Sequence, residues 1–415
     1  MTPVIFSLHL ACYAQAMRVV KVLILCMLLS GLAPAQVVQP DDLQYLGAFR
    51  LPDGPEEYAW AWSGQALAFY PQGDPGGKGD GHPGSLFGVG HDWHQHVSEV
   101  SIPKPVKSRR LQDLPTARTL QPFRDIRGNL YEPMEQARAG LAYLPAQAGQ
   151  NSGKLYFCWD SHMHEGYTGA SHGYCDLNLS APSARGPWAL QGLTTYCTSD
   201  YLFPIPQGWA GKHCEGRRLA TGRFRDGGQG SMGPDLFAIA PWKAKPGQAL
   251  PSTTLLRYSS VYSENPHTLN NYHHSDEWSG GAWLGDTVVF VGTKGKGKCW
   301  YGFANGVVWP EEGPFPPVPD YPNDNRGWWS TSFSAQILFY RAGDLAAVAE
   351  GRMKPWQPQP YAVKTIDQVL LGDQSPQRLR RTGGVAYDPV NRFLYVLEHR
   401  GDGDKSVVHC WRLGG

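Results

Sequence analysis

Five short runs of apolar, β-forming residues recur along the chain, and each run ends in a polar or turn-forming segment. They occupy residues 86–91, 155–160, 236–241, 288–293 and 394–399. Aromatic and β-branched residues dominate them, which is typical of strands packed within a sheet. Repetition of one strand unit is the sequence signature of repeat architectures such as propellers. The pattern therefore predicts a buried strand in each of five blades.

A second repeated piece lies upstream of these runs. Residues 64–71, 140–145 and 384–389 each begin with Gly, contain Ala and end with Pro, and looser equivalents occur at 218–224 and 280–284. Small residues suit an innermost strand, where the blades crowd the axis, and the closing Pro starts a turn. We expect third strands at 97–102, 173–179, 254–258, 337–341 and 407–413, and outer strands near 118–122, 188–193 and 360–366.

These strands predict an all-β fold, a five-bladed β-propeller in which residues 36–415 form one domain. The last blade has no room for a fourth strand before the chain ends at Gly415. The extended segment 43–51 can complete that blade, and such closure removes exposed sheet edges. Irregular spacing of the repeats keeps six or seven blades open as the alternative.

One long insertion separates the second and third strands of the fourth blade. Residues 294–333 carry Trp300, Tyr301, Trp328 and Trp329 among many Gly and Pro residues. A structureless connection of this length within a compact domain is usually functional or disordered. Its aromatic content argues against disorder, so we expect an aromatic loop with a binding role.

The N-terminus has the layout of a secretory signal peptide. Arg18 and Lys21 are basic, residues 22–32 are apolar, and Ala33–Ala35 form a small-residue cleavage site. We assign residues 1–35 to this leader, with Met17 as an alternative start, and expect a secreted or periplasmic protein. The apolar run is shorter than the roughly 20 residues needed to cross a bilayer, and no later segment is apolar enough to span one.

Cleavage of the leader removes Cys12 and Cys26 and leaves six cysteines. An even number of cysteines in an exported protein predicts disulfides. Six cysteines allow fifteen connectivities. Of these we expect Cys158 with Cys175, which lie on neighbouring predicted strands of one blade, and then Cys197 with Cys214 and Cys299 with Cys410.

Titratable residues gather in the connections that we expect on one face of the propeller. The connection between second and third strands and the connection leading into the first strand lie on the same face of a four-stranded blade. His91, Asp160 and His399 end three of the apolar runs, while Glu135, Glu215 and Glu277 precede predicted inner strands. We expect these side chains to surround a central pocket.

The first functional reading is an enzyme acting on a small molecule or, more specifically, on a uronate-containing polysaccharide. Paired carboxylates would serve hydrolysis, for which Glu135, Glu215 and Glu277 are candidates. For β-elimination, His91 or His162 is the base and Tyr167 or Tyr174 the acid. Arg380 and Arg381 would bind a carboxylate, and the aromatic insertion would stack on sugar rings. The formal charge of +1 gives no reason to expect nucleic acid as a partner.

Two further hypotheses about function are open. His94 and His96, like His162 and His164, form His-x-His pairs whose rings share one side of an extended chain. Four imidazoles could hold a divalent or transition metal such as zinc, copper or iron, and so make a metal-dependent enzyme. Because fold does not imply activity, the third reading is a lectin-like binding module without chemistry.

In its leader, its repeated strand pairs and its acids on one face, the chain resembles extracellular β-propellers, a class that includes five-bladed glycosidases and propeller polysaccharide lyases. The resemblance covers residues 43–413 as architecture. It implies a secreted protein acting on carbohydrate. Inverting glycosidases of this shape carry an Asp leading into the first inner strand, where this chain has Trp60–Ser63. Lyases of the class use His, Tyr and Arg, and candidates for all three occur here.

Overall fold

The strands form five four-stranded antiparallel sheets. The computed structural model describes residues 37–54, 59–131, 138–161, 166–223, 225–321, 323–379 and 381–414. The predicted leader, with Cys12 and Cys26, lies outside this part. The sheets are β2 (Leu67–Tyr70), β3 (Ser85–Val89), β4 (Val97–Ser101) and β5 (Thr119–Arg124); β6 (Arg138–Leu144), β7 (Lys154–Asp160), β8 (His172–Cys175) and β9 (Arg185–Trp188); β10 (Tyr201–Pro204), β11 (Leu219–Gly222), β12 (Leu236–Ile239) and β13 (Thr253–Leu256); β14 (Glu277–Leu284), β15 (Thr287–Gly302), β16 (Gly327–Arg341) and β17 (Ala362–Thr365); and β18 (Thr382–Asp388), β19 (Phe393–Asp402), β20 (Lys405–Leu413) and β1 (Leu43–Arg50).

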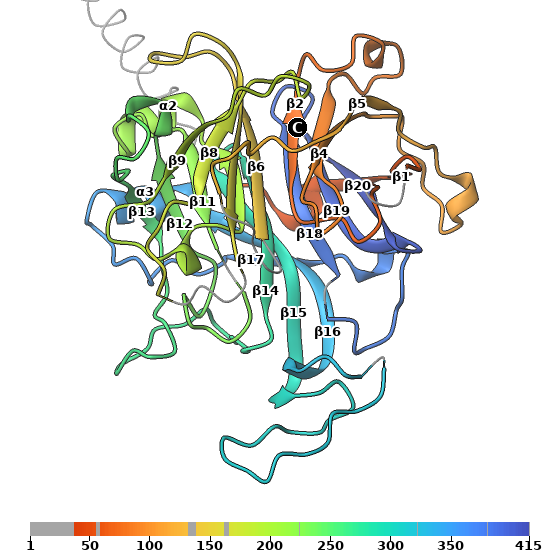
Figure 1. Ribbon diagram of the computed structural model, residues 1–415, viewed down its shortest axis with the longest axis vertical. Coiled ribbons are helices and arrows are strands. Elements are labelled where there is room, and N and C mark those ends of the chain that lie inside the picture. The colour runs from red at the N-terminus through yellow and green to blue at the C-terminus, as the bar shows by residue number, and fades with distance from the viewer. Residues whose placement is uncertain are drawn as a thin grey trace, which may run out of the picture. The chain divides into compact units, whose positions relative to one another are not determined.

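The first strands of the five sheets contact one another in a ring. β2 contacts β6, β6 contacts β10, β10 contacts β14, β14 contacts β18, and β18 contacts β2. Figure 1 shows these sheets with their strands labelled where there is room. The predicted five-bladed β-propeller is confirmed. In the fifth sheet, β1 pairs antiparallel with β20 from Leu43 opposite Leu413 to Arg50 opposite Val407.

Each apolar run is continuous because both faces of its strand are buried, against different neighbours. In β15, Val288 and Phe290 pack between blades three and four, whereas Val289 and Val291 pack between blades four and five. Side chains alternate across a strand, so two buried faces require apolar residues at every position. The five largest apolar clusters each fill the space between two adjacent blades.

Glycines let the inner strands approach one another closely. A Cβ at Gly384 would lie 2.6 Å from the backbone carbon of Ala66, and one at Gly140 would lie 2.7 Å from that of Tyr201. Real Cβ atoms do not come so close to backbone, so these positions exclude any side chain. The Gly that begins the inner-strand pattern is therefore required by the crowding at the axis.

The third blade differs from the prediction by one strand. Its inner strand is β10, and the segment predicted as the inner strand, residues 218–224, instead contains the second strand, β11. The run at 236–241 supplies the third strand, β12, rather than the second. β10 escaped recognition because its sequence, Tyr201–Pro204, lacks the Gly and Ala that mark the other inner strands.

The aromatic insertion is an extended β-hairpin with a long irregular connection at its end, rather than a loop along its whole length. β15 and β16 stay paired from Thr287 opposite Arg341 to Gly302 opposite Gly327, with one shift in register after Lys296. In Figure 1 this hairpin extends beyond the other strands at the bottom of the view. We call the face of the propeller from which it projects the hairpin face, and the opposite one the far face.

The predicted disulfides are wrong, because the six described cysteines are free thiols. Cys175 lies opposite Leu155 in the β7–β8 pair, three positions from Cys158. An odd offset places two side chains on opposite faces of a sheet. Cys158 accordingly packs between blades two and three, and Cys175 between blades one and two.

Short helices occupy connections outside the sheets. The α-helices are α2 (Gln207–His213) and α3 (Ala342–Ala349), and the 3-10 segments are Pro40–Asp42, Gly77–Gly79, Leu111–Asp113, Thr195–Cys197, Pro241–Lys243 and Asp367–Val369. Among the residues that the structure describes, no helix is long and apolar enough to cross a membrane.

Candidate functional site

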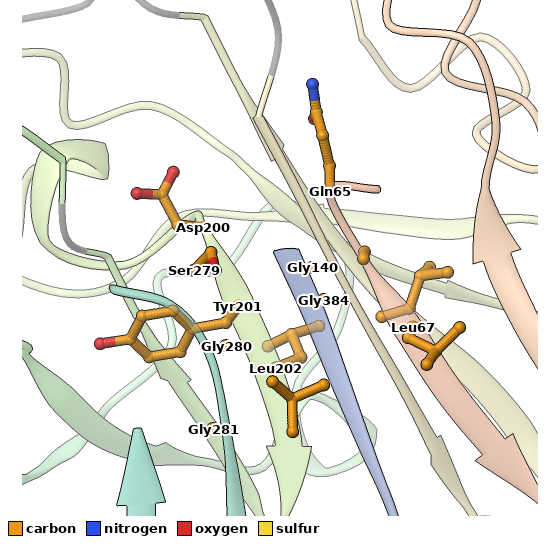
Figure 2. Close-up of a pocket in the computed structure, with 13 residues that line it drawn as sticks. Gln65, Leu67, Gly140, Asp200, Tyr201, Leu202, Ser279, Gly280, Gly281 and Gly384 are labelled. Atoms are coloured by element: carbon orange, nitrogen blue, oxygen red, sulfur yellow. The ribbon is translucent and has the colours of Figure 1, made fainter. Parts of the chain in front are cut away.

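The axis opens on the hairpin face at a narrow mouth formed where the five inner strands begin. Gln65, Asp200 and Ser279 place polar side chains around it, as Figure 2 shows. The pocket holds about 10 Å³, the space of about one water molecule. Gly140, Gly280 and Gly384 line it and bring the backbones together. A ligand of this face would therefore lie over the mouth, among the connections, rather than enter the axis.

A buried ion network ties the second and third blades together beside the mouth. Arg223 follows β11 and is fully buried, with its Nη1 2.5 Å from Oδ2 of Asp160 and its Nε 3.3 Å from Oδ1 of Asp200. The ring centroid of Tyr196 lies 4.4 Å from its guanidinium carbon. One cation thus faces two carboxylates and an aromatic ring. Removing the cation would leave two buried carboxylates without it, which is costly, so the network couples the second blade to the third.

Two glutamines extend the polar lining from the mouth to the first blade. Nε2 of Gln65 donates to Oδ1 of Asp92 at 2.9 Å, and Nε2 of Gln95 donates to the Asp92 carbonyl at 2.7 Å. Nε1 of Trp159 in the second blade donates to Oε1 of Gln95 at 2.8 Å. Gln65 and Gln95 were not predicted, because an amide carries no titratable group and the sequence pattern gives no other signal.

Three histidines line the connection between β3 and β4. The rings of His91 and His94 are 5.8 Å apart between centroids, and those of His94 and His96 are also 5.8 Å apart. The backbone N–H of Trp93 donates to Nδ1 of His91 at 3.1 Å. The other predicted metal ligands, His162 and His164, lie outside the described residues. Within the described part of the chain, no group of three or more His, Cys, Asp or Glu side chains is arranged to hold a metal ion.

His399, one of the predicted site residues, lies against the inner strands of blades one and five. Its Nδ1 is 3.1 Å from the carbonyl oxygen of Ser63, and its ring limits the space at Gly64 and Gly383. It is partly exposed and faces the region of the mouth from the fifth blade.

The neighbouring Glu398 is buried in a closed network. Its carboxylate lies 2.9 Å from Nη1 of Arg378 and 2.8 Å from Nε2 of His409, and it accepts the backbone N–H groups of Leu371 and Gly372. Burial alone would raise the pKa of Glu398, but the hydrogen bond and charge of His409 and the charge of Arg378 lower it to about 2. The carboxylate of Glu398 therefore stabilises the fold and is not available to a ligand.

The base of the hairpin carries a second buried ion pair. Nζ of Lys294 lies 2.9 Å from Oδ1 of Asp276, which also accepts the backbone N–H of Gly295. Burial raises the pKa of Asp276 to about 6, against the opposing charge of Lys294. Glu277 begins β14 next to this pair, opposite Thr293, and is partly exposed on the hairpin face.

The predicted aromatic residues of the insertion divide into packed and partly exposed side chains. Trp329 is 7% exposed and lies beside Phe333. Trp300, Tyr301 and Trp328 are partly exposed. In the hairpin, Trp300 lies opposite Trp329, and Tyr301 lies opposite Trp328. The ring centroids of Tyr301 and Trp328 are 5.5 Å apart. The paired strands thus present part of an aromatic surface.

Four predicted site residues, two arginines and two glutamates, are either placed away from a ligand or not described. Arg381 is 3% exposed. Its guanidinium lies 3.4 Å from Asp367 and donates to the Ser375 carbonyl at 2.8 Å. Arg381 therefore binds other groups of the protein and is not accessible to a ligand. Glu215 lies on the far face, because it follows the end of β10 rather than preceding an inner strand. Its predicted place on the site face is wrong. Glu135 and Arg380 lie outside the described residues.

Exposed aromatic side chains concentrate on the hairpin face. All six that are prominently exposed among the described residues, from 42% to 86%, lie in its connections: Trp62, Trp93, Tyr167, Tyr262, Phe315 and Tyr321. The buried tryptophans Trp60 and Trp278 pack between blades instead. Because all six share one face and aromatic side chains are enriched at interaction sites, this face is the candidate binding surface.

Comparison with known proteins adds no assignment. No protein family model matches the chain. No curated protein matches it. A chain in the crystal structure of the Chaetomium thermophilum polycomb repressive complex 2 (PRC2) is 10% identical, with 90% of this chain and 98% of that chain covered and a TM-score of 0.33. A likeness at that TM-score supports no statement about function.

Proposed function

We propose that this protein binds carbohydrate on the hairpin face. The observation that carries the proposal is that all six prominently exposed aromatic side chains of the described residues lie in connections of that face. Aromatic rings offer large, rigid apolar faces, and a sugar ring presents one face of C–H groups that can lie against them. At the mouth, the partly exposed Gln65 and Ser279 add an amide and a hydroxyl for the hydroxyls of the ligand.

A uronate-containing glycan is the ligand class that the charges favour. Arg400 lies 4.7 Å from the ring centroid of Trp62, and its side chain is 56% exposed. Its Nε is 3.8 Å from Asp404, a separation longer than a hydrogen bond. An exposed guanidinium beside an exposed indole could bind the carboxylate of a sugar while the ring stacks on the indole.

Binding is better supported than cleavage. Asp160, a candidate catalytic group, is 1% exposed and held by Arg223, which leaves it no accessible proton-transfer role in this arrangement. His91, Glu277 and His399 are the predicted catalytic residues that remain partly exposed on the hairpin face. Hydrolysis and β-elimination are therefore outcomes to be tested. The proposal includes export of the protein by the leader at residues 1–35, so that it meets glycans outside the cytoplasm.

Calorimetric titration with uronate oligosaccharides and their neutral counterparts tests the proposal. Trp62→Ala and Trp93→Ala should each weaken binding by about tenfold, because an aromatic anchor commonly contributes more than about 1 kcal/mol. Arg400→Gln should weaken binding of the uronate and leave the neutral counterpart unchanged. Val390→Ala removes an exposed apolar side chain from the far face and is the matched control.

The same titrations distinguish the alternatives. Release of reducing ends would add hydrolysis to the proposal, and absorbance from unsaturated products would add β-elimination. The proposal would be overturned if none of the glycans in the panel bound saturably. Binding that is unchanged by both tryptophan substitutions would also overturn it.

A further inference from the structure

The axis widens toward the far face into a cavity of about 200 Å³. The far halves of all five inner strands line it, together with the segment that follows β10. Its walls are mainly apolar, with Leu141, Leu202, Ile205, Trp283 and Val385 among them. The glycines at the mouth nearly close the other end, so the cavity is a pocket of the far face and is separate from the carbohydrate surface.

Among the described residues, one charged side chain lines this apolar cavity, that of Arg218. Its Nη1 donates to Oε1 of Gln147 at 3.2 Å, and its buried Nε has no hydrogen-bond partner within the described ranges. In the part of the chain that the structure describes, this guanidinium forms no ion pair, and no charged neighbour contributes to its pKa shift. Burial lowers the pKa of Arg218, yet an arginine stays protonated at neutral pH.

A half-buried cation that lacks an acidic partner is a costly feature for a protein to keep, because buried charges are normally paired. The neighbouring Arg217 shows the usual arrangement: it lies 2.8 Å from Glu215. The missing partner of Arg218 is a negative charge, and the walls around it are apolar. A ligand that matches both features carries one anionic group on an apolar body.

We propose that this cavity binds a small monocarboxylate with one aromatic ring or a branched chain of similar size. A cavity of about 150 Å³ lined by apolar side chains accommodates benzene, so about 200 Å³ has room for one ring and a short acid arm. The carboxylate would accept hydrogen bonds from the guanidinium, a planar donor that suits carboxylate geometry. A single lining cation favours one negative charge over two.

Titration of the full chain with 3-phenylpropanoate, followed by calorimetry and ligand-observed NMR, tests this site. The matched probe is 3-phenylpropan-1-ol, which keeps the ring and replaces the carboxylate by a hydroxyl. The acid should bind about 10- to 100-fold more tightly than the alcohol, as expected for a charge-assisted hydrogen bond. Arg218→Gln should weaken binding of the acid by the same factor and leave binding of the alcohol unchanged.

Lys212→Gln removes an exposed positive charge from α2 on the same face and should leave both affinities unchanged. Comparison of the acid with the alcohol on the unaltered chain decides the question even if the Arg218 variant fails to fold. No saturable binding of the acid, equal affinity for acid and alcohol, or binding indifferent to Arg218→Gln would each overturn the proposal. Because these ligands carry no sugar, the result is independent of the glycan titrations.

Discussion

Nη1 of Arg223 lies 2.5 Å from Oδ2 of Asp160, although 63 residues separate them and they belong to different blades. Both side chains are almost completely buried, at 0% and 2% exposure. The ion pair therefore joins two repeats beside the mouth of the axis.

Removal of the cation should destabilise the protein strongly. Arg223→Met leaves Asp160 and Asp200 buried without their shared partner, which should lower the free energy of unfolding by about 3–5 kcal/mol. Chemical denaturation measures this loss. In the double variant with Asp160→Asn the loss should be smaller than the sum of the two single losses, because the substitutions remove one interaction. A loss below about 0.5 kcal/mol in the single variant would show that the pair is not coupled to folding.

The stability of the protein should fall in acid through Glu398. Its pKa is about 2 in the folded state, below the ordinary value of 4.5, so the unfolded state binds the proton first as pH falls. The stabilisation is present above about pH 5 and is lost as pH falls toward 2, and it amounts to about 3 kcal/mol. Denaturant midpoints at stepped pH should show this slope in the unaltered chain and a flatter one in Glu398→Gln. Parallel slopes would contradict the assignment.

Substitution of an inner-strand glycine by alanine should destabilise the packing between two neighbouring blades. Gly384→Ala would place a Cβ 2.6 Å from the Ala66 backbone, which cannot move without its strand. We expect a loss of about 1–3 kcal/mol in the free energy of unfolding. Gly343→Ala is the matched control, since a Cβ added to that helical glycine would meet no atom of the described residues within 4 Å; it should gain up to about 1 kcal/mol. Equal effects of the two substitutions would refute the packing argument.

Reduction should leave the fold unchanged, because the six described cysteines are free. Thermal unfolding with and without a thiol reductant should give the same midpoint. Titration of thiols in denaturant should return the same number before and after reduction. A midpoint that falls on reduction, together with a rise in the number of thiols, would instead support the disulfides predicted from the even cysteine count.

The repeated strands were recognisable because their signal is local. A run such as Val288–Val291 needs apolar residues on both faces, and the Gly, Ala and Pro of residues 384–389 mark a crowded strand that ends in a turn. These requirements act on neighbouring residues, so they leave a pattern in the chain. β10 is also an inner strand but lacks the Gly and Ala of the others, so the sequence pattern did not predict it.

The order of residues was enough to show that the chain repeats a strand unit and to favour five blades, while the structure decided the number of blades. Which residues meet depended on the folded arrangement. Register placed Cys158 and Cys175 on opposite faces of their sheet, and the strand order of the third blade moved Glu215 to the far face and brought Arg223 to Asp160. Local pattern fixes the alternation of side chains along one strand, whereas register and packing between distant strands depend on the summed contacts of the whole ring.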